Sequence, residues 1–239
     1  MSATLIAHRG AVRIGKAELI QIEPPAATNT WKPVAHRVLV NTLTEILSHR
    51  GIEVKREEYA IQRQGNILFG VMDLFWGGTV DYYAALGLRT SNDKRFAIQI
   101  AIGARVIVCD NLLMSGELIA LKRKHTAGLE LIEELTAGVR RYELGYGQLG
   151  KGIERLKGVL LPTMEAREVV YSVFAQKVLP LKLFPTVVHS LSLQVGEGRT
   201  LTRWTMHNVF TDALKKLTSP AAAFEANVKL GKFFGLSSY

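Results

Sequence analysis

One polar segment of the sequence combines side chains that are suited to binding phosphate. Residues 89–95 read Arg-Thr-Ser-Asn-Asp-Lys-Arg, with three cations, one carboxylate and two hydroxyl groups. Lysine and arginine pair with phosphate, and binding residues concentrate on loops that rigid strands hold in place. The expected phosphate contacts are Arg89, Lys94 and Arg95, and the expected polar site is Ser91, Asn92 and Asp93.

The charge of the whole chain favours the same kind of partner. Its 239 residues include 30 Lys and Arg and 21 Asp and Glu, a net charge of +9. An excess of this size is typical of proteins that bind nucleic acid, although a charge run is also typical of a merely solvated surface. Further expected phosphate contacts are Arg105, Lys122, Arg123 and Lys124. Aromatic residues that would offer stacking faces to bases, or else belong to the core, are Trp76, Tyr82 and Tyr83.

Other chemistries have weaker signals. A metal-dependent nuclease would need several carboxylates close together to hold a divalent metal. The acids at expected strand ends or on loops are Asp73, Asp81, Asp93 and Asp110. A single cysteine, Cys109, excludes an internal disulfide and a Cys-rich zinc site. Residues 145–150 match the pattern G-x-G-x-x-G, but no strand precedes them and a helical pattern passes through them, so we expect neither nucleotide nor cofactor binding.

Several polar residues lie outside these groups. Asn111 follows the second half of an expected hairpin, and His207 and Asn208 share one flank of a helix with Trp204 and Thr211. A buried polar network that docks this helix is the favoured interpretation, and an active site is the alternative. His36 and His49 lie on another expected helix, too far apart to share a metal, and are predicted at the surface or its boundary.

The elements that must position these residues predict an α+β fold. Residues 33–50 have helical spacing, and residues 52–88 alternate as strands. Residues 96–109 are predicted to form a hairpin that turns tightly at Gly103. Together they give an antiparallel meander of about five strands with the helix covering one face. Residues 1–32 are expected to be an irregular lead-in, and residues 112–124 to be a helix.

The second half of the chain is predicted to be helical. Apolar residues between 132 and 156 recur at alternating spacings of three and four, which is a heptad seam. We expect one long helix, 129–158, that packs on residues 164–178 or on another subunit in a homo-oligomer. A helix at 201–217 is predicted to be the last, after a chain break at Pro180 and Pro185. One domain is expected, with 1–116 mainly sheet plus one covering helix and 117–239 a mainly helical extension. With no membrane span or signal peptide in the sequence, a cytoplasmic location is predicted.

Two short signatures resemble a known family, the phage- and plasmid-like proteins of domain-of-unknown-function family 932. One consists of residues 90–93, Thr-Ser-Asn-Asp, followed by a strand and Arg105 to Asn111, Arg-Val-Ile-Val-Cys-Asp-Asn. The other runs from Trp204 to Thr211, and His-Arg-Gly at 8–10 and the segment 65–73 also fit. Thr90 and Asn92 depart from the family's loop, which has a histidine. The resemblance implies a mobile-element setting in a bacterial host cell and brings no established activity with it.

Three functions are compatible with these observations. The favoured one is a non-enzymatic nucleic-acid-binding protein that binds or anneals single-stranded DNA, as in DNA recombination. The order of helix, antiparallel meander and following helix is similar in outline to phage single-strand annealing proteins. The alternative is a protein-interaction module, such as a phage factor that acts on a host defence or an assembly partner, and the third is a metal-dependent nuclease.

Overall fold

A six-stranded antiparallel sheet is the centre of the fold. The structure, a computed structural model, describes residues 11–75, 82–106, 112–217 and 220–236. Strands neighbour one another in the order in which they occur in the sequence. They are β1 Val12–Ile14, β2 Glu53–Gln62, β3 Ile67–Phe75, β4 Tyr82–Ser91, β5 Ile98–Val106 and β6 Leu112–Arg123. The predicted α+β class and the antiparallel meander are confirmed.

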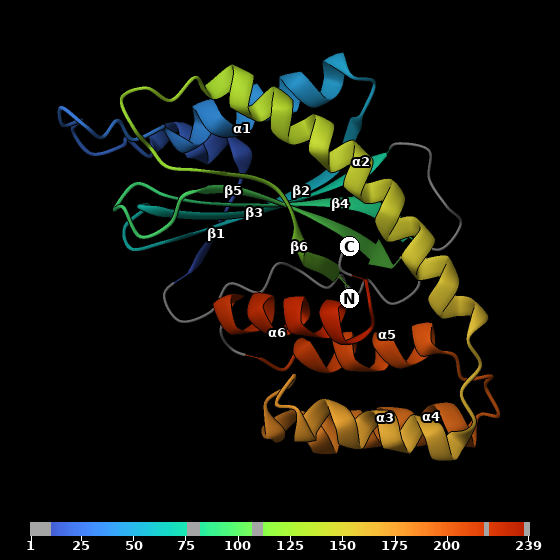
Figure 1. Cartoon of the computed structure of the whole chain (residues 1–239). Coiled ribbons are helices and arrows are strands. Elements are labelled where there is room, and N and C mark those ends of the chain that lie inside the picture. Colours follow the sequence, from blue (N-terminus) through green and yellow to red (C-terminus); the bar gives the residue numbers. More distant parts are fainter. Residues whose placement is uncertain (1–10, 76–81, 107–111, 218–219, 237–239) are drawn as a thin grey trace.

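One face of the sheet is covered by α1 His36–His49 and α2 Leu131–Gly158 (Figure 1). This face carries the large apolar residues Leu88, Ile100 and Leu121, which are buried and lie opposite one another on β4, β5 and β6. Gly138 lets α2 approach them closely, because a Cβ atom there would lie 3.1 Å from the Leu121 Cβ. The prediction of a covering helix at 33–50 is therefore confirmed.

The opposite face is built from smaller residues and is covered by the C-terminal helices. Ala85, Gly87, Ala101 and Gly103 occupy alternate positions on β4 and β5 and are buried. On this side lie α5 Arg203–Leu214 and α6 Pro220–Phe233, and α6 packs along β6 (Figure 1). Small side chains on the sheet allow a helix to approach closely, which explains why glycine and alanine are found in these strands.

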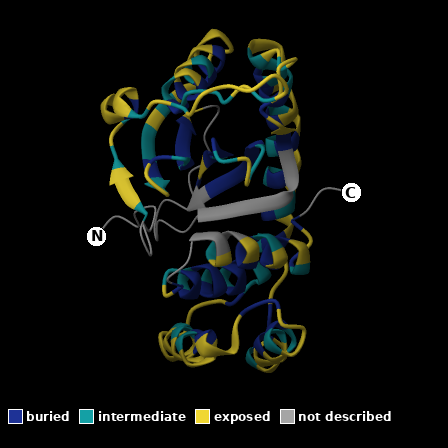
Figure 2. Cartoon of the chain, turned by 90° about the vertical axis from the view of Figure 1, so that its left-hand side faces the viewer, coloured by how far each residue is buried: buried dark blue, intermediate teal, exposed yellow. Residues whose placement is uncertain are grey.

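Two further helices form an outer layer. These are α3 Thr163–Ala175 and α4 Phe184–Gly196, and α4 packs on α5. Figure 2 shows exposed residues along the outer sides of both helices. The short 3₁₀ helices η1 Lys16–Gln21 and η2 Leu181–Leu183 complete the described elements. No described helix is both long enough and apolar enough to cross a membrane.

Two predictions for the sheet are wrong. Gly103 does not turn a hairpin; it lies inside β5, because the strand continues through it and pairs there with both neighbours, Ala85 on β4 and Met114 on β6. Residues 112–124 are not a helix but form β6, which pairs with β5 from Arg105↔Leu112 to Ile98↔Arg123. The division expected at residue 116 consequently falls inside a strand. Part of the lead-in, 12–14, is also a strand.

The helical half contains more than was predicted. The long helix is confirmed as α2, but its seam packs on β5, β6, α1 and α5 rather than mainly on α3. Pro185 does not break the chain; it lies in the first turn of α4, where a missing N–H costs little. The helix predicted at 201–217 is confirmed as α5, but the prediction that it is the last helix is wrong, since α6 follows it.

Candidate nucleic-acid interface

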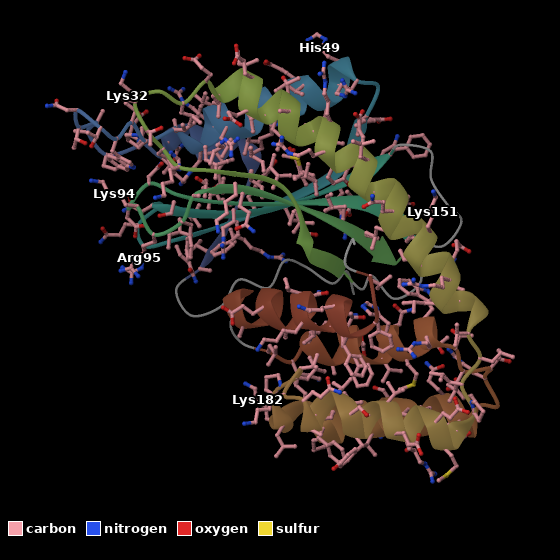
Figure 3. The ribbon with its side chains drawn as sticks, viewed as in Figure 1. Lys32, His49, Lys94, Arg95, Lys151 and Lys182 are labelled. Carbon is pink, nitrogen blue, oxygen red and sulfur yellow. The ribbon has the colours of Figure 1, made fainter. Side chains whose placement is uncertain are left out.

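Four chain segments meet at one end of the sheet, which we call the loop end: residues 31–32, 63–66, 92–97 and 124–130. Trp31 forms a bridge with Thr126, and the Lys32 N–H donates to the His125 carbonyl at 3.3 Å. The Asn92 N–H donates to the Asn66 carbonyl at 2.7 Å. Figure 3 shows Lys32, Lys94 and Arg95 together at this end.

Beneath the loop end, buried histidines join these segments. The Val34 N–H donates to the His125 Nδ1 at 3.0 Å, so Nδ1 carries the lone pair and Nε2 the hydrogen. The His125 Nε2–H therefore donates to the Thr90 Oγ1 at 2.8 Å. The His36 Nε2–H in turn donates to the Gly65 carbonyl at 2.7 Å. His125 thus joins the backbone just before α1 to β4, and His36 joins α1 to the turn at residues 63–66.

Both of these imidazoles are neutral at pH 7. Burial, and then the neighbouring His36, lowers the pKa of His125 to about 4. Burial also lowers the pKa of His36, against the opposing effect of the Gly65 carbonyl. The prediction of His36 at the surface or its boundary is wrong, since its side chain is fully buried. These histidines hold the loop end together but add no charge to it.

Residues 91–93 of the predicted polar site are brought together, and Ser91 and Asp93 are occupied by bonds of their own loop, whereas the buried Asn92 Oδ1 has no hydrogen-bond partner among the described residues. The Ser91 hydroxyl donates to the Asp93 carboxylate and accepts the Arg95 N–H at 3.1 Å. Burial alone would raise the pKa of Asp93, but the bonds from Ser91 and Arg95 and the charges of Arg95 and Arg63 lower it overall. Asp93 also pairs with the Arg95 guanidinium at 3.1 Å. The chemistry of these residues shapes the loop, and it leaves an ionised Asp93 that neutralises part of Arg95.

A cation and an aromatic ring form the most exposed part of the loop end. The Lys94 Nζ lies 4.9 Å from the centre of the Trp31 ring, a cation–π contact. Lys94 is exposed and Trp31 is partly exposed. Lys94 has a φ of 66°, a left-handed backbone conformation that is typical of a tight turn. Trp31 was not predicted as a site residue; its position beside Lys32 just before a helix was its only signal.

The other predicted cations divide into two groups. Arg89 is half-buried, its Nη2 donates to the Gln99 Oε1 at 2.8 Å, and burial lowers its pKa. Its guanidinium also lies 4.3 Å from the centre of the Phe96 ring, so it serves the sheet more than the surface. Arg123 pairs with Glu134 at 2.5 Å. Lys122 and Lys124 are exposed. The side chain of Arg105 lies outside the described part of the chain, as does all of Asn111.

The remaining predicted stacking faces do not belong to the loop end. Tyr82 is buried, so it cannot offer a face to a base. Tyr83 is exposed, but it lies near the start of β4, at the end of the strand opposite the loop end. Trp76 is outside the described residues.

The acids of the predicted nuclease alternative do not converge where they can be located. Asp73 is buried and pairs with the Arg56 guanidinium at 2.9 Å. It lies opposite Ala85, six strand residues from Ser91, so it is about 20 Å from Asp93. Asp81, Asp110 and Cys109 lie outside the described residues. Within the described part of the chain, no three His, Cys, Asp or Glu side chains are grouped to hold a metal ion.

The polar residues of α5 form part of an aromatic core. His207 is fully buried and stacks on Trp204, with ring centres 5.4 Å apart, and its edge meets Phe234 at 5.3 Å. Neither ring nitrogen has a hydrogen-bond partner among the described residues. The Thr211 hydroxyl donates to carbonyls of its own helix, those of His207 and Asn208. The predicted docking network is therefore wrong for His207, which contributes through its ring faces.

Searches against protein-family models, curated proteins and solved structures gave no match. Function is therefore proposed from the geometry and charge of this chain, together with the short signatures of its sequence.

Proposed function

We propose that the loop end binds single-stranded nucleic acid, with DNA favoured, and that the protein acts by binding or annealing strands rather than by catalysis. The observation that carries this proposal is the Lys94–Trp31 pair flanked by Lys32 and Arg95 (Figure 3). Lysine and arginine neutralise phosphates, and an accessible aromatic ring stacks on a base of any sequence. The family resemblance adds a mobile-element setting to the proposal.

A single strand suits this arrangement better than a duplex does. Bases of a duplex are stacked on one another, so a side chain such as Trp31 has no base face to contact unless the duplex is opened. In a single strand, a base can lie on the face of the Trp31 ring that Lys94 does not cover. Lys32, Lys94 and Lys124 can then contact the flanking phosphates. Lys124 belongs to the same end, since the adjacent His125 bonds to Thr90.

The test is binding of a fluorescent single-stranded oligonucleotide and its duplex across a salt series. Each lost phosphate contact should reduce the slope of log K against log salt by about 0.7, so K32A with K94A should reduce it by about 1.4. W31A should instead weaken binding by about 1–3 kcal/mol at every salt concentration. K151A is the matched control, because Lys151 is an exposed lysine of α2 far from the loop end (Figure 3).

Three results would contradict the proposal: no binding at low salt, equal losses from K94A and K151A, or a preference for the duplex that W31A leaves unchanged. Cleavage of the oligonucleotide that needs a divalent metal would instead favour the nuclease alternative. The interaction-module alternative would be favoured if binding were absent and a protein partner docked elsewhere.

Self-association through helix 129–158 has less to support it than the sequence suggested. Most of the seam is used inside the chain, since Leu135, Val139, Leu149 and Ile153 are buried against other elements. The large apolar side chains that remain exposed among the described residues of α2 are Ile132 and Leu144.

A further inference from the structure

The outer layer of helices exposes more large apolar side chains than its position at the surface would lead one to expect. We call the following set the α3–α4 seam: Met164, Tyr171, Leu181, Phe184, Val188 and Val195. All six are more than a third exposed, and Tyr171 and Leu181 are each 74% exposed. Exposed apolar residues scattered singly need no explanation, whereas a contiguous patch marks an interaction surface.

Helix geometry places the seam residues of α3 and α4 on one flank, and Leu181 lies in η2, just before α4. The side of α3 that faces the rest of the chain carries the buried Ala166, Val170 and Val173, and the corresponding side of α4 carries Val187 and Leu191. Successive residues of a helix are about 100° apart. Met164 and Tyr171 therefore lie roughly 130–150° round the helix axis from the buried side of α3, and Phe184, Val188 and Val195 lie roughly 40–80° round from that of α4.

Ring contacts show that the two flanks meet. Phe174 packs edge to face on Phe184, with ring centres 5.2 Å apart. Tyr171 lies about one turn before Phe174, and Val188 about one turn after Phe184, so they continue the same line. The seam is therefore a continuous apolar stripe along the junction of α3 and α4, on the outer side of the layer that Figure 2 shows as exposed.

Charge indicates what can cover this stripe. Residues 163–196 contain the acids Glu165 and Glu168 and the bases Arg167, Lys177 and Lys182, a net charge of +1 in a chain of net charge +9. A nucleic acid would gain little here, and a second copy of this cationic chain would be repelled less here than at the loop end. Near-neutral, apolar helix pairs are the surfaces from which four-helix bundles are built.

The size of the stripe fits a second copy. Six side chains, each more than a third exposed, offer on the order of 100 Å² apiece; with the flanking residues of both helices they approach the roughly 800 Å² per partner of a stable interface. A twofold axis would place α3 and α4 of one copy on α3 and α4 of the other, which makes one surface serve both partners.

We propose that the α3–α4 seam is the self-association surface of this protein, and that two copies pair there as a four-helix layer. The loop end, on a different layer of the fold, stays accessible in such a dimer (Figure 1). This inference does not rest on the proposed nucleic-acid binding, because it concerns other residues and another property.

The experiment is sedimentation velocity of the full chain over a concentration series. The wild-type protein should sediment as a dimer that dissociates on dilution. Y171E and L181E should each raise the dissociation constant at least tenfold, because a charge would be buried in the apolar contact. L144E is the matched control: Leu144 is 73% exposed on α2, outside the seam, and its variant should remain a dimer. Circular dichroism of each variant shows whether it is folded.

Two results would overturn the proposal. One is a wild-type protein that stays monomeric at every concentration, in which case the partner of the stripe would be a different protein. The other is dissociation by L144E with folded Y171E and L181E still dimeric, which would assign self-association to α2. Since the measurement contains no nucleic acid, its outcome is separate from that of the binding test.

Discussion

The buried imidazole of His207 should make the protein sensitive to mild acid, and H207F should remove the part of that sensitivity that His207 contributes. His207 lies between the Trp204 and Phe234 rings, and neither ring nitrogen has a hydrogen-bond partner among the described residues. Burial lowers its pKa from 6.5 to about 3. The unfolded chain therefore binds a proton near pH 6.5 that the folded chain refuses until about pH 3, so stability falls as the pH decreases through this window.

The size of the effect follows from the two pKa values. At pH 8 both states are neutral at this residue, and at pH 5 only the unfolded state is protonated. A gap of 1.5 pH units below 6.5 corresponds to about 2 kcal/mol at 1.36 kcal/mol per unit. Burial also lowers the pKa values of His36 and His125. These two residues are present in both the wild type and H207F, so their contributions cancel in the comparison.

Urea denaturation of the wild type and H207F at pH 8 and pH 5 measures this difference. At a single pH, the larger phenyl ring and the loss of unsatisfied nitrogens act in opposite directions. The change in the stability difference between the two pH values isolates the proton: H207F should gain about 2 kcal/mol on the wild type between pH 8 and pH 5. A stability difference that is the same at both pH values would refute the reasoning and show that His207 is protonated or solvated in the folded state.

Two further substitutions test the packing of the loop end. T90V removes the acceptor of the His125 Nε2–H and should cost about 1–3 kcal/mol of unfolding free energy, with T90S retaining most of the stability; equal losses from both would exclude the hydrogen bond as the cause. G65A should be more destabilising than G51A in the same assay: both residues have a positive φ, but a Cβ at 65 would lie 2.8 Å from the Ile22 Cγ2, whereas a Cβ at 51 meets nothing within 4 Å. G51A should cost about 1 kcal/mol from the backbone alone, and a similar loss from G65A would mean that Ile22 moves aside freely.

Local patterns predicted the elements whose spacing is unambiguous. The helix at 33–50, the strands between 52 and 88 and the long helix at 129–158 each follow one period over many residues. The helix predicted at residues 112–124 was wrong because leucine, glutamate, alanine and lysine favour a helix, whereas pairing with β5 overrides this preference. The turn predicted at Gly103 was wrong because a glycine inside a strand is indistinguishable in sequence from one that makes a turn. The chain break predicted at Pro185 was wrong because proline breaks a helix in its interior but is well tolerated in its first turn.

The candidate site was only partly predictable. Segment 89–95 was selected by its charges, and Lys94 and Arg95 do lie at an exposed loop. Trp31 was not selected, since nothing in the sequence brings residue 31 next to residue 94. Arg89 and Lys122 were selected together and do share a sheet face, each lying opposite Gln99. The burial of His36 was missed because it depends on the Gly65 carbonyl, a backbone group that no sequence pattern displays.

The neutral histidines explain how residues far apart in the chain can act as one surface. Lys32, Lys94 and Lys124 are separated by 62 and 30 positions in the sequence, and like charges would by themselves drive their segments apart. The hydrogen bonds of His125 and Asn92 fix the backbone beside these lysines. The repulsion between the lysines is therefore overcome by the free energy of folding, before any ligand binds. A strand that binds there finds the cations already in place, so less loop ordering opposes binding. The imidazoles that join these segments carry no charge at pH 7, so they add nothing to the repulsion between the lysines.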